Sequence, residues 1–161
     1  MFGDTNLGLG PSVVLHLSRS VPEGSCLYHD RHFTTIPLKE ELQKRNLHST
    51  GTIMANRIHT DKTSLKFKKD SQMYRGESQQ MVRDPKVLVK WKDNKSVLIA
   101  SNCTGSNCTE MVKRWDNRTR TYVDVNAPKI IQNYNRYMGG VDVLDQQVEY
   151  YRTFIKTRKG H

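Results

Sequence analysis

Short strand-like runs alternate with helical segments over the first third of this chain, and that alternation constrains the fold more than any other feature. Residues 26–29 (CLYH) form an apolar run of the length of a buried strand, and residues 50–55 (TGTIMA) are β-prone. Residues 12–17 and 36–45 space their apolar side chains as a helix does. The order helix–strand–helix–strand predicts an α/β or α+β layer and argues against a purely helical bundle.

The middle of the chain has a different texture. Residues 57–80 are polar and lysine-rich with almost no periodicity, which predicts a linker or an irregular excursion. Residues 87–91 and 97–100 are rich in β-branched side chains and flank a polar turn, so they predict a hairpin. Residues 112–115 and 121–125 flank a second polar turn and predict another pair of strands.

The last third returns to helix. Pro128 opens a segment whose apolar residues recur at three- and four-residue steps. Gly139-Gly140 interrupts this segment, and residues 141–154 then resume the same spacing. We therefore expect two consecutive helical stretches at this end of the chain.

The composition excludes several classes of protein. Hydrophobic residues make up 35% of the 161, and no run approaches the roughly 20 apolar residues of a membrane span. The opening residues lack the basic start and apolar stretch of a signal peptide. Three cysteines are too few for a disulfide scaffold. We expect a protein with a modest core, a highly charged surface and no membrane or small-molecule partner.

The charge points to a polyanionic partner. Lysine and arginine total 26 against 16 acidic residues, which gives a net charge of +10 and a pI near 9.7. The excess lies in residues 57–120, which hold 15 basic and 7 acidic residues. Nucleic acid is the default partner for such a balance, bound through its phosphates with little reading of sequence. A solvated basic surface with no partner stays open as the alternative. The candidate phosphate contacts are Lys66, Lys68, Lys69, Arg75, Lys90, Lys92, Arg83 and Lys86.

Three carboxylates could hold a divalent metal. Asp142 and Asp145 are three residues apart on a predicted helix and so share one face, and Asp30 follows a predicted strand. Mg²⁺ and Mn²⁺ prefer carboxylate oxygens, and paired metal ions cleave phosphodiesters. From spacing alone, Asp142 and Asp145 are better explained as ordinary acids on the surface of an amphipathic helix.

Five segments, in order along the chain, resemble the piggyBac transposase family. Residues 134–146 (YNRYMGGVDVLDQ) closely resemble its YNxxMGGVDxxDQ segment, which is long and specific. The other four lie at residues 6–17 (an LGLG stretch), 28–35 (a strand ending in D-x-x-F-T), 50–57 (TGT followed by N-R) and 90–95 (W-x-D-N-K). The resemblance thus covers nearly the whole chain.

The resemblance implies a partial RNase H-like transposase core carrying a β-rich insertion. Residues 1–56 then belong to the core, residues 57–127 form the basic insertion, and residues 128–161 are the C-terminal helices of the core. By position, Asp30 resembles the second catalytic aspartate and Asp142 the third, so these two would bind Mg²⁺ or Mn²⁺. Asp145 matches a further acid of the family motif, close to the metal site.

The chain also departs from the family pattern. The first catalytic aspartate of the family lies upstream of the segment that corresponds to Met1, and Asp4 is not its equivalent. The family's cysteine-rich zinc-binding tail is not matched, so the chain looks like a member truncated at both ends. Two-metal catalysis distributes charge over three or more carboxylates. We therefore expect this chain not to catalyse strand transfer alone.

Three functional hypotheses follow. The first is a transposase-derived, catalytically inactive protein that binds DNA non-specifically in the nucleus. The second is a metal-dependent transposase or nuclease core that is active only in a longer chain. The third is a decayed remnant without a stable fold, because a sheet that loses strands exposes hydrogen-bonding edges. A homodimer is an open expectation for the first two.

A few other side chains have two readings. Trp91 and Trp115 are expected to anchor the core of the insertion, although an exposed tryptophan could stack on a base. His29 flanks Asp30 and could approach a metal or simply pack within its strand. Cys103 and Cys108 lack a partnering Cys-His pair, so a zinc site there is not expected.

Overall fold

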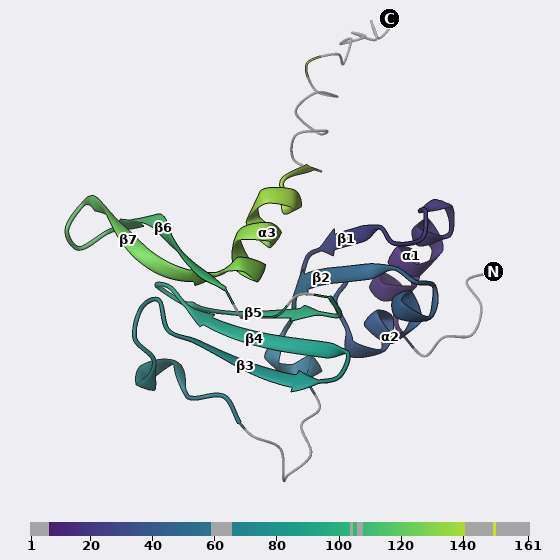
Figure 1. Ribbon diagram of the computed structural model, residues 1–161, viewed down its shortest axis with the longest axis horizontal. Coiled ribbons are helices and arrows are strands. Elements are labelled where there is room, and N and C mark those ends of the chain that lie inside the picture. The colour runs from purple at the N-terminus through teal and green to yellow at the C-terminus, as the bar shows by residue number, and fades with distance from the viewer. Residues whose placement is uncertain (1–6, 59–65, 104, 106–107, 141–149, 151–161) are drawn as a thin grey trace, which may run out of the picture.

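The computed structural model describes residues 7–58, 66–103, 105, 108–140 and 150 (Figure 1). The described elements are three α-helices, three short 3₁₀ turns and seven strands. The helices are α1 (Leu9–Leu17), α2 (Ile36–Lys44) and α3 (Lys129–Met138). The 3₁₀ turns are η1 (Ser18–Ser20), η2 (Ala55–Arg57) and η3 (Asp70–Gln72). The strands are β1 (Cys26–His29), β2 (His48–Thr52), β3 (Ser78–Arg83), β4 (Lys86–Lys92), β5 (Ser96–Ser101), β6 (Thr109–Asp116) and β7 (Thr121–Pro128).

One five-stranded sheet runs through the molecule in the order β1-β2-β5-β4-β3. β1 and β2 are parallel, and the other neighbours are antiparallel. β6 and β7 form a separate two-stranded antiparallel hairpin. The large sheet therefore contains strands from both sides of residue 57. The division of the chain into residues 1–56, 57–127 and 128–161 stays a prediction.

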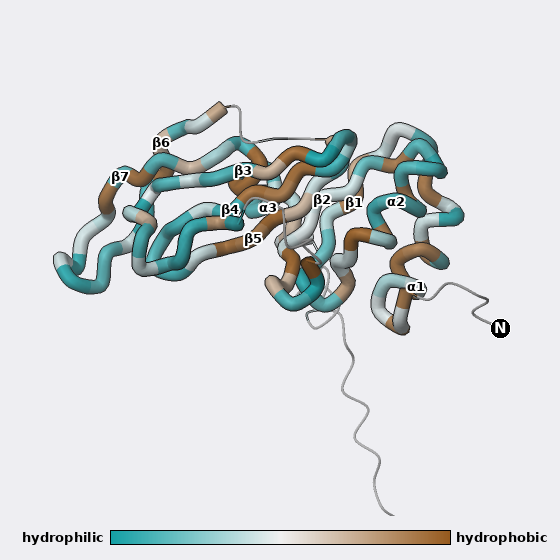
Figure 2. The backbone as a smooth tube through the Cα atoms, turned by 90° about the horizontal axis from the view of Figure 1, so that it is seen from below, coloured by the Kyte–Doolittle hydropathy of each residue, from teal (hydrophilic) through white to brown (hydrophobic). Residues whose placement is uncertain are grey.

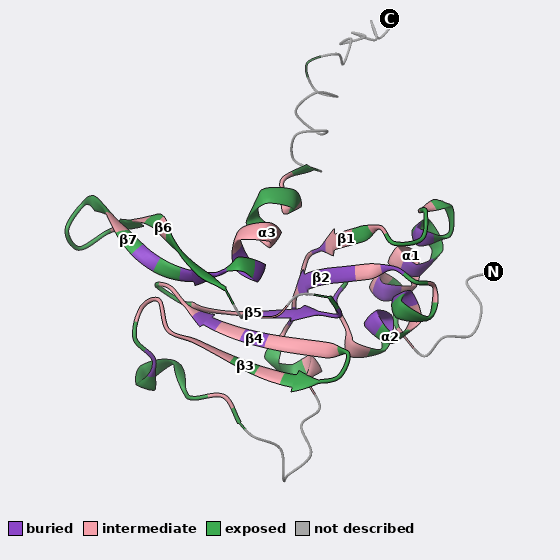
Figure 3. Ribbon diagram, viewed as in Figure 1, coloured by how far each residue is buried: buried purple, intermediate pink, exposed green. Residues whose placement is uncertain are grey.

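The two faces of the sheet are covered by different elements. α1 and α2 pack beside β1 and β2, where Leu15, Leu38 and Leu42 form a small apolar cluster. On the other face, α3 and the β6–β7 hairpin cover a second cluster built on Trp91 and Ile99. Figure 2 shows apolar residues concentrated along β4 and β5, and Figure 3 shows the buried positions of β2 and α2. The helices α1 and α2 thus cover one face at β1 and β2, and α3 with the β6–β7 hairpin covers the other face.

Local sequence explains where α2 begins and ends. The Thr35 hydroxyl accepts a hydrogen bond from the Leu38 N–H at 3.2 Å, and Pro37 occupies the first turn. At the other end, Asn46 adopts a left-handed φ of 55°, which asparagine tolerates better than most residues. These two signals fix a nine-residue helix between β1 and β2.

Most predicted elements are confirmed, including both strand pairs, and the mixed α+β class is confirmed with them. Three details were wrong. The strand expected at residues 50–55 is β2 at His48–Thr52. The irregular stretch 57–80 contains the start of β3, an edge strand whose polar side chains hide its β character. Trp91 is buried at 2% exposure, but Trp115 is 46% exposed and does not anchor a core.

The second predicted helix, residues 141–154, lies largely outside the described residues. Among the described residues, no helix is both long and apolar enough to cross a bilayer.

Candidate nucleic-acid interface and metal-binding carboxylate

Asp30 lies immediately after β1, at the carboxyl end of that strand. Its carboxylate accepts a hydrogen bond from the Thr52 hydroxyl of β2 at 3.3 Å, and its side chain is 41% exposed. The His32 Nε2 atom lies 4.0 Å from the other carboxylate oxygen. Asp30 is therefore held by its neighbours and still open to a ligand.

Helix α3 lies next to this carboxylate. The Tyr134 hydroxyl and the Thr52 hydroxyl are 3.3 Å apart, so a chain of contacts joins α3 through β2 to Asp30. Burial raises the pKa of Tyr134, and the nearby Asp30 raises it further. One turn later, the Tyr137 ring packs against Tyr28 of β1 with 5.0 Å between ring centroids. These contacts fix the helix over the end of β1.

The other two predicted carboxylates, Asp142 and Asp145, follow α3 in sequence and lie outside the described residues. In the part of the chain that the structure describes, no group of three or more histidine, cysteine or acidic side chains is placed to hold a metal ion. The assignment of Asp30 and Asp142 as metal ligands therefore stays a prediction.

Beneath Asp30, a chain of buried polar side chains links β1, β2 and α2. The Thr34 hydroxyl donates to the Asp30 carbonyl oxygen at 3.0 Å, so it must accept from His29 Nδ1 at 2.7 Å. His29 Nε2 is then an acceptor and receives the Ser49 hydroxyl hydrogen at 2.8 Å. Lys39 donates to the Ser49 hydroxyl at 3.0 Å and to the Ser49 carbonyl oxygen at 3.2 Å. The network fixes His29 as the Nδ1–H tautomer.

Burial decides the protonation of the two basic groups in this network. Burial lowers the pKa of His29 to about 3, and the adjacent Lys39 lowers it in the same direction. Burial also lowers the pKa of Lys39 to about 7. His29 is therefore neutral at physiological pH, and it packs in its strand as the second reading of its sequence position proposed.

Gly51 on β2 makes room for this network. A Cβ atom placed there would lie 2.6 Å from His29 Nδ1 and 2.5 Å from the His29 carbonyl oxygen, and it would also overlap the Thr34 hydroxyl. No larger residue fits without moving the backbone of β1 or breaking the hydrogen bonds. The TGT sequence at residues 50–52 is thus explained by close packing next to Asp30.

A cavity of about 500 Å³ opens between α3, β6 and the β4–β5 turn. Thr52 and Tyr134 line the end of it closest to Asp30, Trp91 and Ile131 are among its apolar residues, and Arg114 lines it from β6. The Arg114 guanidinium lies 5.6 Å from the Trp91 ring centre and 3.7 Å from Asp93. The candidate carboxylate thus has a sheltered, partly apolar space beside it.

Internal acids neutralise most of the predicted phosphate contacts. Five of the eight form ion pairs within the chain: Lys68 with Glu77, Arg75 with Asp93 and Asp116, Lys86 with Glu40, and Lys90 and Lys92 with Asp70. The hydrogen bonds from Lys90 and from Ser96 hold the pKa of Asp70 well below its usual range. Their role in binding DNA stays a prediction, but their charges are already partly compensated.

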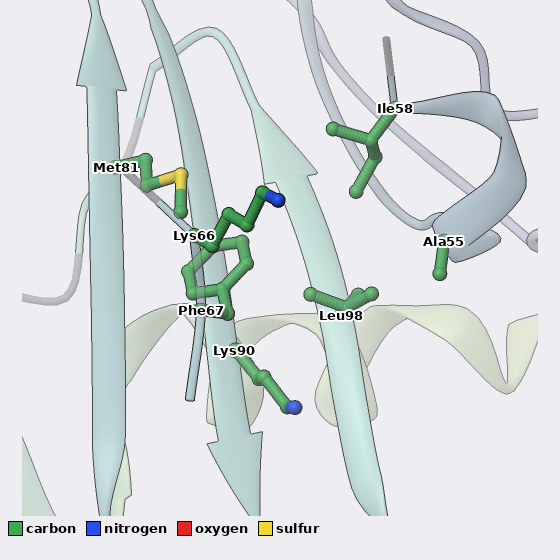
Figure 4. Close-up of a pocket in the computed structure, with 7 residues that line it drawn as sticks. All are labelled: Ala55, Ile58, Lys66, Phe67, Met81, Lys90 and Leu98. Carbon is green, nitrogen blue, oxygen red and sulfur yellow. The ribbon is translucent and has the colours of Figure 1, made fainter. Parts of the chain in front are cut away.

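Lys66 and Lys69 differ from these five. Both are exposed, and neither makes an ion pair with another residue that the structure describes. Lys66 borders a small pocket of about 200 Å³ with Phe67, Met81 and Leu98 on the sheet face opposite α3 (Figure 4). Lys90 lines the same pocket, where its ammonium donates to the Lys68 carbonyl oxygen at 2.7 Å. The segment 66–69 is thus docked on the sheet and carries uncompensated charge.

In the β4–β5 and β6–β7 turns, the sequence argument missed three exposed basic residues. Lys95 lies in the β4–β5 turn, and Arg118 and Arg120 lie in the β6–β7 turn. Arg75 ties these two turns together, since its Nε–H donates to Asp93 at 2.8 Å and another of its nitrogens donates to the Trp115 carbonyl oxygen at 3.2 Å. Their position in turns between strands was the available signal, because side chains at hairpin turns face solvent.

One described side chain of the site, Asp30, is of the type that binds a divalent metal ion. Asp30 offers a hard oxygen donor at the end of a strand, which is the ligand type that Mg²⁺ and Mn²⁺ prefer. When bound at such a site, these ions supply activation of the attacking oxygen and stabilisation of the leaving oxygen. The protein's contribution at Asp30 is to fix the carboxylate through Thr52 and the backbone through Thr34.

Comparison with known proteins decides the family. The sequence profile of the transposase IS4 family matches residues 3–160. The chain belongs to this transposase family. The piggyBac resemblance is confirmed by two human proteins, piggyBac transposable element-derived proteins 3 and 2. Each is 29% identical to this chain, over 94% and 97% of its length respectively.

A solved structure supports the same conclusion. The piggyBac transposase, determined by cryo-EM in a synaptic complex with hairpin DNA, matches 91% of this transposase-family chain with a TM-score of 0.65 and 28% identity. The chain spans about a quarter of the curated relatives, 26% and 27% of their lengths, and 28% of the piggyBac transposase chain. Divalent-metal dependence is general in transposases of this kind, and here it rests on the family.

Proposed function

We propose that this transposase-family chain binds DNA through backbone phosphates with little sequence preference. The observation that carries the proposal is the placement of Lys66 and Lys69, two exposed lysines without an ion pair in the described part of the chain. The net charge of +10 supports it, as does the likeness to a transposase whose structure contains hairpin DNA. We also propose a nuclear location, which follows from the proposed DNA binding.

The experiment compares charge-removing variants at one low salt concentration. Binding to fluorescent duplexes of two unrelated sequences is measured by anisotropy for the wild type, the Lys66→Gln/Lys69→Gln double variant and a Lys86→Gln control. Lys86 is ion-paired with Glu40, so its loss removes the same kind of charge from a compensated position. We expect the double variant to bind both duplexes several-fold more weakly and the control to bind nearly as the wild type does.

Two results would overturn the proposal. A loss of binding free energy per removed charge that is the same in the control (one charge) and in the double variant (two charges) would show that only overall charge matters. A strong preference for one duplex would show base reading rather than phosphate binding. The stoichiometry of the same titration tests whether the chain binds as a homodimer.

We also propose that the chain does not join DNA strands by itself. The proposal rests on the motif resemblance, in which the chain matches two catalytic aspartates of the family, Asp30 and Asp142, whereas two-metal catalysis distributes charge over three or more carboxylates. Losing a carboxylate from a two-metal site removes much of the stabilisation of the transition state.

The alternative function is metal-dependent DNA cleavage within a longer chain, and the position of Asp30 beside α3 favours it. A nicking assay on supercoiled plasmid with Mg²⁺ or Mn²⁺ separates the two when it is run both on this chain and on a longer chain that contains it. We expect no nicking by this chain. Nicking that Asp30→Asn and Asp142→Asn both abolish would establish the alternative in place of the inactive reading.

A further inference from the structure

The β6–β7 hairpin has one covered face and one open face. On the covered face, Val112 and Val123 pack against the apolar cluster around Trp91, and the Arg114 guanidinium lies over the Trp91 ring. Because successive side chains of a strand point to opposite faces, the residues between these point away from the body of the protein. The open face carries Met111, Lys113, Trp115, Tyr122, Asp124 and Asn126.

The open face ends in a pair of exposed aromatic rings. Trp115 and Tyr122 are paired across the two strands, and their ring centroids lie 5.2 Å apart in an edge-to-face arrangement. The two residues are 46% and 69% exposed. An Arg75 nitrogen donates to the Trp115 carbonyl oxygen at 3.2 Å, which fixes the backbone that carries the indole. A fixed and exposed aromatic pair offers a flat apolar surface to a ligand.

Positive charge lies beside these rings. The turn that joins the two strands carries Arg118 and Arg120, and Figure 3 shows this turn as exposed. On the open face, Lys113 lies opposite Asp124, so these two charges offset each other. Neither turn arginine forms an ion pair with another residue that the structure describes. The turn therefore keeps two positive charges next to the aromatic pair.

The geometry of the turn does not explain these arginines. Arg120 adopts a left-handed φ of 51°, a conformation that glycine or asparagine adopts at lower cost. Asp116, the acid at the start of the turn, is bound by Arg75 at 3.9 Å and by the backbone N–H of Arg118 at 2.9 Å. The side chains of the two turn arginines therefore need another reason to be there, and a ligand at the surface supplies one.

We propose that the open face binds single-stranded DNA, with unpaired bases stacked on Trp115 and Tyr122 and phosphates held by Arg118 and Arg120. Every base has a flat π-face, so stacking on aromatic side chains tolerates any sequence. In a duplex these faces are covered by neighbouring base pairs, and surface rings reach them only where bases are unpaired. The two arginines and the net charge of +10 make an anionic strand the complementary partner. The inference rests on the DNA binding proposed above and adds the form of DNA that this surface prefers.

The test compares three probes of about 12 nucleotides on the 161-residue chain. They are an oligo(dT) strand, a strand of the same length with abasic sites in place of its central nucleotides, and a duplex, each measured by anisotropy. The wild type should bind oligo(dT) roughly tenfold more tightly than the abasic strand, because the abasic strand keeps the phosphates and loses the stacking. Trp91 is buried and is the one other tryptophan, so unlabelled oligo(dT) should quench the emission of Trp115.

Four variants locate the binding on the open face. Trp115→Ala should bind oligo(dT) roughly tenfold more weakly and the duplex as the wild type does. Trp115→Phe keeps a ring and should retain most of the affinity while losing the quenching. Arg120→Asn suits the left-handed φ and removes a charge, so it should weaken oligo(dT) binding several-fold. Met111→Ala is the matched control, because Met111 is an apolar residue of the same face with 61% exposure and lies away from the turn.

Three outcomes would overturn the inference. The first is equal affinity of the wild type for oligo(dT) and the abasic strand, a comparison that needs no variant to fold. The others are unchanged tryptophan emission at saturating oligo(dT) and equal losses of affinity in Trp115→Ala and Met111→Ala. Each of these leaves the proposed phosphate binding intact as long as the duplex binds. Binding to none of the three probes would overturn both proposals.

Discussion

Two parts of the five-stranded sheet are held by different chemistry: the β1–β2 part, which we call the polar end, and the β4–β5 part, which we call the apolar end. At the β1–β2 end, the space beneath the sheet contains Lys39, Ser49 and Thr34, each fully buried and hydrogen-bonded. At the apolar end, the other face of the sheet carries a cluster of buried apolar side chains that includes Trp91 and Ile99. Apolar packing is indifferent to direction, whereas a hydrogen-bonded network fixes each atom.

That difference matches what each end supports. The polar end holds the backbone of Asp30, the predicted metal ligand, through Thr34. The apolar end carries the β6–β7 hairpin and the docked basic segment, which need a stable platform but little atomic precision. Variants at the two ends should therefore fail in different ways.

The largest effect is expected at the apolar end. Trp91→Ala should lower the free energy of unfolding by about 3–5 kcal/mol, because it leaves a large cavity and removes the indole hydrogen bond to the Asn126 carbonyl oxygen. Urea denaturation measures this loss. Trp115→Ala is the matched control and should change stability by less than about 1 kcal/mol, since that ring is 46% exposed. Equal losses would mean that the hairpin, not Trp91, anchors this end.

A smaller loss is expected from crowding the polar end. Gly51→Ala should cost roughly 1–3 kcal/mol, because the new methyl group overlaps His29 and Thr34. The comparison is Gly139→Ala, where nothing lies within 4 Å of the added Cβ and φ is −74°. If both variants melted alike, close packing beneath Asp30 would not be the reason for a glycine at residue 51.

The polar end should also make stability depend on pH. The folded pKa values of His29 and Lys39, about 3 and about 7, lie below their ordinary values of 6.5 and 10.5. Between each pair of values the unfolded chain binds more protons, so the free energy of unfolding should rise with pH from 3 to 6.5 and again from 7 to 10.5. From pH 7 to pH 9, Lys39 should contribute a gain on the order of 2 kcal/mol.

Lys39→Met isolates that contribution. The Ser49 hydroxyl keeps His29 as its partner, and the Ser49 carbonyl oxygen keeps the Asn102 N–H at 3.2 Å, so the variant leaves neither group without a hydrogen bond. The variant should fold, and its free energy of unfolding, measured by urea denaturation, should be nearly the same at pH 7 as at pH 9. An unchanged pH slope in this variant would show that the Lys39 ammonium is not the titrating group.

Much of the fold follows from local sequence patterns. The helical spacing, the Thr35 cap and the strand-like runs predicted α2, β1 and both strand pairs, because each depends on neighbouring residues. β3 was missed since its polar side chains show no alternation, and its existence depends on pairing with β4. Trp115 was misplaced because composition cannot say which face of a hairpin meets the body of the protein.

The candidate site was only partly predictable, because many of its contacts join residues that are far apart in the sequence. The motif resemblance identified Asp30, but the network beneath it joins residues 10 to 20 positions apart, whose contacts no spacing rule gives. The ion pairs that compensate Arg75 and Lys90 likewise depend on where distant acids fold. Counting charges located the basic region but not the lysines left unpaired within it.

The salt dependence of DNA binding tests the central claim most directly. The association constant of the wild-type chain for a short duplex is measured by anisotropy between about 50 and about 200 mM salt. Phosphate binding predicts that its logarithm falls linearly with the logarithm of salt, by about 0.9 per phosphate contacted, and that Lys66→Gln/Lys69→Gln flattens the slope by roughly 2. An affinity that stays constant over this range would contradict the account.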